Sequence, residues 1–146
     1  MIGRTIQVGV GKETTRGTSV APSYWLPTLA PSSIEDKKQY EDDAQSFGNI
    51  ADTDDSVIVK EWSEGEINGK VRDRSFGLLL LAAFGSVSSA QKGGDATVYD
   101  HTFTIANSNQ HQALTFARKD AYEQFRFALG MVSSLKISAE IGKFVS

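Results

Sequence analysis

The sequence predicts a mainly β protein with one short helix (class α+β), an antiparallel β-sandwich or half-barrel with a long loop and an N-terminal arm. Several short segments alternate apolar and polar residues, which is typical of half-buried strands. Most connections between them are too short for parallel crossovers. Residues 74–85, rich in Leu and Ala and without β-branched residues, favour a helix.

Length and composition suit one soluble domain spanning residues 1–146. Hydrophobic residues make up 40% and charged residues 23% of the chain, as in globular rather than disordered proteins. There is no cysteine, which excludes a disulfide framework and thiolate metal sites. The N-terminus lacks the apolar segment of a secretory signal. We therefore expect a protein of cytoplasmic origin without a membrane segment.

Residues 1–31 are expected to form a strand followed by an extended arm. Alternation over residues 6–10 predicts the strand. All three prolines of the chain fall within residues 17–31, where they disfavour regular structure. Tyr24 and Trp25 lie between these prolines and are candidate contacts with a neighbouring subunit. Packing of Trp25 on its own domain is an equally good interpretation.

Residues 32–56 are polar and acidic with little periodicity, which predicts a long loop. Residues 35–66 hold eleven acids against three lysines, a local balance of −8 in a chain of net charge −3, so the remainder carries +5. This asymmetry would let the acidic segment of one copy meet the basic surface of another. A solvated loop remains the alternative. The candidate contact residues of the loop are Asp42, Asp43, Asp52, Asp54 and Asp55.

Residues 57–146 are expected to form the β core around a buried helix. Two strands, 57–62 and 67–71, would be joined by a turn at 63–65, and the helix would end at Gly85 in a left-handed conformation. After a loop at 86–95, strands are predicted at 99–105, 113–118, 125–131 and 135–141. The chain ends with strand character, as an open edge would. The residues of the buried helix that brace the sheets are Leu78, Leu80, Leu81 and Phe84.

No catalytic, metal or cofactor site can be assembled from the sequence. The run around Gly11 and Lys12 lacks the first glycine and the Ser or Thr of a phosphate-binding loop, because Glu13 follows the lysine. The acids near Asp52 lack the glycine of a calcium loop. His101 is expected on an inward face of its strand and His111 in a turn, so neither has a catalytic partner. The prediction is a protein that is not an enzyme and has no cofactor.

Three stretches resemble the tail tube proteins (major tail proteins) of long-tailed bacteriophages. They are GKETTRGT (11–18) with YWLP (24–27), WSEGEINGKV (62–71) with GLLLLAAFG (77–85), and YDHTFT (99–104). The resemblance implies a virion protein, made in the bacterial cytoplasm, that assembles with itself into stacked hexameric rings and contacts other tail proteins. DNA would pass through the tube without specific binding. Similar proteins continue further, which suggests a form shortened at its C-terminus.

Two other functions remain open. An adhesin or carbohydrate-binding β-sandwich would use Tyr24, Trp25 and Trp62 as an aromatic platform. A tail terminator or connector would share the fold and differ only in its partners. The acids of the loop could face either a neighbouring subunit or the lumen of a tube, where they would repel DNA phosphates.

Reversing the charges of Asp52, Asp54 and Asp55 is expected to weaken assembly, because opposite charges on the neighbouring copy would lose their partners. Sedimentation of the purified variant beside the unchanged protein measures this. Assembly at the original concentration would instead place these acids in solvent or in the lumen.

Overall fold

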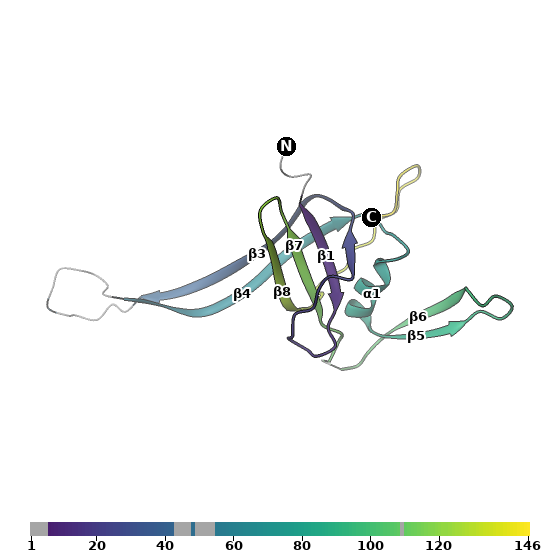
Figure 1. The fold of residues 1–146 in the computed structure, drawn as a ribbon, viewed down its shortest axis with the longest axis horizontal. Helices are drawn as coiled ribbons and strands as arrows, with labels where there is room; N and C mark the ends of the chain where they lie inside the picture. Colours follow the sequence, from purple (N-terminus) through teal and green to yellow (C-terminus); the bar gives the residue numbers. More distant parts are fainter. Residues whose placement is uncertain (1–5, 43–47, 49–54, 109) are drawn as a thin grey trace. The chain divides into compact units, whose positions relative to one another are not determined.

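The computed structural model describes residues 6–42, 48, 55–108 and 110–146 (Figure 1). Contacts divide the chain into two units, one formed by Met1–Ala30 with Asn68–Ser146 and the other by Pro31–Ile67. The mainly β class with one helix is confirmed, and the described strands form antiparallel sheets without a closed barrel. The elements are β1 (Gln7–Lys12), β2 (Tyr24–Leu26), β3 (Thr28–Asp42), β4 (Ser56–Gly69), α1 (Phe76–Phe84), β5 (Gly85–Gln91), β6 (Tyr99–Ile105), β7 (Leu114–Lys119) and β8 (Gln124–Gly130).

The first unit is built on a four-stranded antiparallel sheet in the order β2-β1-β7-β8. Helix α1 packs on one face of it, where Val10, Ala82 and Leu114 are fully buried. Leucines and alanines form the helix as predicted, and Gly85 ends it at φ 93° with its N–H bonded to Leu81 O.

The expected burial of Leu78, Leu80, Leu81 and Phe84 is wrong for the single chain. All four are half-buried, and Ala82 is the buried residue of α1. A helix that is apolar on most of its surface is stable only if other elements pack on most of its faces. The four-stranded sheet packs on only one face of α1. Leu78 packs against the core there.

The arm folds back onto its own sheet, which is one of the two interpretations that the sequence left open for Trp25. Residues 20–22 and Trp25 lie against β1 at two glycines. A Cβ atom added to Gly9 would come within 2.7 Å of Pro22 Cβ, and one added to Gly11 within 2.7 Å of Ala21 O. Glycine at these positions therefore lets the arm approach the strand closely.

The second unit is the hairpin of β3 and β4, which pair in a two-stranded sheet. The loop predicted for residues 32–56 is wrong up to Asp42, and the turn predicted at 63–65 lies inside β4. Charged side chains are paired across the strands: Lys37 binds Glu64, and Lys38 Nζ lies 3.1 Å from Glu61 Oε1. Opposite charges facing each other support a strand that has few apolar residues.

Two further sequence predictions are wrong. Residues 86–95 hold strand β5, not only a loop, because its serines bond across to β6, as Ser86 Oγ does to Thr104 O at 3.0 Å. Residues 135–141 form no strand, since alternation cannot make a strand without a neighbour to pair with. Ser138 and Ser146 instead exchange backbone hydrogen bonds of 2.7 and 3.0 Å.

The carboxylate of Glu13 joins three separate parts of the sheet unit. Glu13 is only 3% exposed. Its Oε1 accepts hydrogen bonds from Leu129 N at 2.8 Å and from Thr115 Oγ1 at 2.9 Å, and its Oε2 accepts one from Gly17 N at 2.7 Å. Thr115 Oγ1 in turn accepts a bond from Val20 N at 3.1 Å. The network fixes the arm to β7 and β8.

The same carboxylate stabilises an unusual backbone conformation. Leu129 has φ 57°, the left-handed region, at an irregularity in the pairing of β7 with β8. Such a conformation costs about 1–3 kcal/mol in a residue with a side chain. A hydrogen bond to a charged acceptor contributes about 1.5–3 kcal/mol, enough to offset that cost.

Burial alone would raise the pKa of Glu13, but the hydrogen bonds from Leu129, Gly17 and Thr115 and the nearby charge of Arg16 outweigh it. The pKa is therefore held below its ordinary value of 4.5. A group with a lowered folded pKa contributes stability above its unfolded pKa. That contribution is lost as the pH falls below 4.5 and through the folded value.

Glu13→Gln is expected to lower the free energy of unfolding by about 1–3 kcal/mol at neutral pH, because an amide NH₂ replaces one of the accepting oxygens. The difference from the unchanged protein should shrink as the pH falls below 4.5 and through the lowered pKa of folded Glu13, where the native carboxylate also takes up a proton. Urea unfolding across a pH series measures both effects. Glu123→Gln, at an exposed residue, is the control and should lie within about 0.5 kcal/mol. A Glu13→Gln deficit that is constant with pH would contradict the assignment.

Candidate assembly surfaces

The β3/β4 hairpin exposes apolar side chains that a lone protein would bury. Val57, Ile58 and Val59 on β4 are 58%, 45% and 50% exposed, and Tyr40 on β3 is 58% exposed. A two-stranded sheet is marginal in water unless another layer covers it. Within the described residues of this unit only Ile34 is buried. The hairpin therefore has the character of a surface that binds a partner.

Two of the predicted contact acids lie at one end of this hairpin. Asp42 is the last residue of β3 and Asp55 directly precedes β4, and both are exposed. Figure 1 shows the two strands running in opposite directions, which brings these ends together. Asp55 Oδ1 accepts a hydrogen bond from Ser56 N at 2.8 Å. Asp43, Asp52 and Asp54 lie outside the described residues.

Tyr24 and Trp25, the predicted contacts of the arm, form most of β2 at an edge of the four-stranded sheet. They are 42% and 41% exposed. Successive residues of a strand point to opposite faces, so their rings do not form one flat platform. Trp25 faces Gly9 in the register, and its ring would lie 3.0 Å from a Cβ added there. Trp25 thus packs on its own domain and keeps part of its surface exposed.

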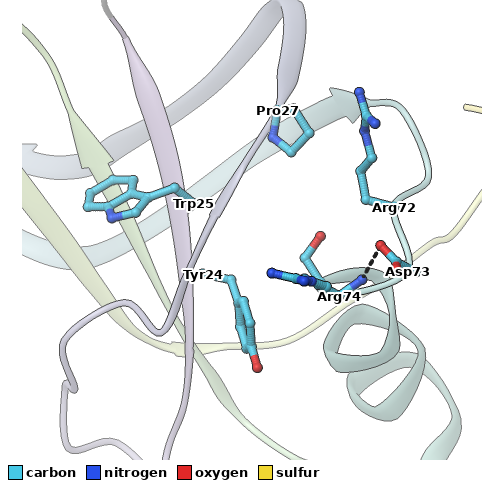
Figure 2. A pocket seen from close by; sticks show the side chains of 7 residues that line it. Tyr24, Trp25, Pro27, Arg72, Asp73 and Arg74 are labelled. Carbon is cyan, nitrogen blue, oxygen red and sulfur yellow. Dashed lines mark hydrogen bonds between the residues drawn. The ribbon is translucent and has the colours of Figure 1, made fainter. Parts of the chain in front are cut away.

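An open hollow of about 390 Å³ lies between β2 and the start of α1, within the first unit (Figure 2). One wall is aromatic and apolar, and the other is charged. Figure 2 shows Arg74 reaching toward β2 near Tyr24, with Arg72 on the side of Pro27. Its lining consists of Tyr24, Trp25, Pro27, Arg72, Asp73, Arg74 and Ser75.

The charged wall of the hollow is fixed by the turn before the helix. Asp73 Oδ1 accepts a hydrogen bond from Arg74 N at 2.9 Å, and Phe76 N donates to Arg72 O at 3.2 Å. The ion pairs among the described residues include neither arginine, and both side chains are exposed. The sequence interpretation did not single out these arginines. The excess of positive charge outside residues 35–66 is the related signal in the sequence, and it does not distinguish these two arginines from the other basic residues.

The remaining candidate residues, Trp62, His101 and His111, each contact a neighbouring residue of their own chain. The Lys60 ammonium lies 4.7 Å from the centre of the Trp62 ring, and Trp62 Nε1 donates to Glu64 at 3.4 Å. His101 is exposed, not inward as predicted, because β5 and β6 form a single layer; its Nδ1 lies 2.8 Å from Ser89 Oγ. His111 Nε2 lies 3.2 Å from Ala106 O.

The described residues contain no group of three or more His, Cys, Asp or Glu side chains placed to hold a metal ion. None of the helices in the described part of the chain is long and apolar enough to cross a membrane.

Comparisons with known proteins identify a family for the chain. No curated protein and no solved structure matches the chain. A family model described as "phage tail tube protein" matches residues 3–146, nearly the whole chain. This is a structural family of the virion tail, not an enzymatic one, and it implies oligomeric assembly with tail proteins. The chain belongs to the phage tail tube protein family.

Proposed function

We propose that this chain is the repeating subunit of a phage tail tube, in which copies form hexameric rings that stack into the conduit for DNA ejection. The observation that carries the proposal is the β3/β4 hairpin. It leaves Val57, Ile58 and Val59 about half exposed in the single chain. Fully burying such a side chain contributes about 1.5–3 kcal/mol. A neighbouring copy that covers the hairpin would supply this stabilisation.

Edge strands provide a second reason for self-assembly. The four-stranded sheet has β2 at one edge and β8 at the other, and each leaves one side without a described neighbour. Backbone donors and acceptors along an open edge readily pair with another chain. Phe125 and Leu129 on β8 are 43% and 49% exposed, so this edge is also apolar.

The acids of the hairpin suit contact between subunits better than contact with DNA. Asp42 and Asp55 would repel a phosphate backbone, and the whole chain carries a net charge of −3. A tube through which DNA slides freely needs no specific binding site for DNA. In this proposal DNA passes without specific binding, and Asp42 and Asp55 meet a neighbouring copy. We propose the same role for Asp43, Asp52 and Asp54, which lie between them in the sequence.

Val57→Asp combined with Val59→Asp is expected to abolish rings and tubes while leaving the subunit folded. Both side chains are exposed in the single chain, so the charges would be buried only on assembly. Light scattering after size exclusion and negative-stain microscopy measure assembly, and urea unfolding measures the fold.

The matched control is Val98→Asp, since Val98 is 41% exposed and lies outside the hairpin. It should assemble like the unchanged protein. Unchanged protein that stays monomeric at all concentrations and salt strengths would refute the proposed function. Tubes formed normally by the double variant would show that the hairpin is not the contact.

A further inference from the structure

We infer that the hollow between β2 and α1 is the receptor for the acidic end of the β3/β4 hairpin of a second copy. This inference rests on the proposed function, because it names the surface on which the neighbouring hairpin would dock. The hollow belongs to the first unit and the hairpin is the second unit, so each is defined by its own contacts.

The hollow has the chemistry to bind carboxylates. Arg72 and Arg74 present two exposed guanidinium groups against the single carboxylate of Asp73, and that carboxylate is already bonded to Arg74 N. A guanidinium offers parallel N–H donors that match the two oxygens of a carboxylate. Neither group takes part in an ion pair among the described residues.

The hollow has an apolar wall beside its charged wall, and the end of the hairpin likewise has charged residues beside exposed apolar ones. Tyr24 and Pro27 line the hollow opposite the arginines, and Tyr24 is 42% exposed. On the hairpin, Asp55 lies two residues before Val57 and three before Ile58, and these two side chains are 58% and 45% exposed. A partner segment with acids beside exposed aliphatic residues therefore fits both walls at once.

The hairpin is long enough to bridge between copies. An extended strand advances about 3.3 Å per residue, so Asp42 lies about 36 Å along β3 from Pro31. The charge balance of −8 over residues 35–66 against +5 elsewhere favours an encounter between the hairpin of one copy and the first unit of another.

A nucleic-acid phosphate is the other ligand that guanidinium groups bind. The lining of the hollow favours a protein segment, because the aromatic and apolar wall of Tyr24 and Pro27 has no counterpart on a phosphate backbone. The chain's own acids also exceed its basic residues, 18 to 15. Binding of DNA is therefore treated as an outcome that would overturn the inference.

Cross-linking between two singly substituted chains tests the contact directly, since the natural chain has no cysteine. Arg74→Cys protein and Asp55→Cys protein are mixed before assembly, assembled together and treated with a short bis-maleimide. A cross-linked dimer containing one chain of each kind is expected. Lys92→Cys, at an exposed turn after β5, replaces Arg74→Cys in the control mixture. Assemblies that give no more cross-link than this control would overturn the inference.

Charge reversal and rescue test the chemistry. Arg72→Glu with Arg74→Glu should raise the protein concentration needed for assembly at least about tenfold. Adding Asp42→Arg and Asp55→Arg to the same chain should restore assembly, whereas Lys92→Glu alone should change it little. Reversal without effect, or without rescue, would overturn the inference.

The same proteins distinguish the remaining outcomes. Fluorescence anisotropy with duplex DNA should show no binding that depends on Arg72 and Arg74, and binding lost on their reversal would assign the hollow to phosphate. If the unchanged protein never assembles, both the proposed function and this inference are contradicted. Normal tubes from the reversed variant would remove only the inference.

Discussion

The buried carboxylate of Glu13 is the interaction on which the sheet unit depends. It accepts hydrogen bonds from Gly17, Thr115 and Leu129, which belong to the arm, β7 and β8. A buried charge is tolerated only when it is well partnered, and three donors meet that condition. The residue that rules out a phosphate-binding loop in the sequence is thus the one that holds the arm in place.

Because the arm is fixed, so is the hollow beside it. Residues 20–22 lie against Gly9 and Gly11, and β2 follows along β1 with Tyr24 opposite Val10. On the other side, the helix begins at Phe76, two residues after Arg74, with Ser75 as its N-cap. Close packing of the arm on Gly9 and Gly11 therefore positions the aromatic wall, and the turn that begins the helix positions the charged wall. Both walls belong to one unit.

Local sequence composition correctly predicted those elements that are stabilised by interactions between residues close in the sequence. The helix follows from its leucines and alanines, and its end from Gly85, so both could be read from the sequence. Strand β3 could not, because its support comes from partners such as Glu64, 27 residues from Lys37. Residues 135–141 alternate apolar and polar side chains but form no strand, because the backbone hydrogen bonds of this stretch are local, as between Ser138 and Ser146.

The candidate site shows the same division. Tyr24 and Trp25 could be singled out by their type and their proline-rich surroundings. Arg72 and Arg74 could not, because only the folded chain brings the turn before α1 to the side of β2. Of the five predicted acids, Asp42 and Asp55 lie within the described residues, and sequence order alone explains why they share one end of the hairpin.

The wide sequence separation of Glu13 from its hydrogen-bond partners also determines how late in synthesis the sheet unit can form. Thr115 follows Glu13 by 102 residues and Leu129 by 116. At about 5–20 residues per second, the ribosome needs about 5–20 s to deliver the first of these partners. Until then β1 has no β7 to pair with, and the Glu13 carboxylate lacks the donor hydroxyl of Thr115. A newly made chain can therefore complete the sheet unit only after Leu129 has been synthesised.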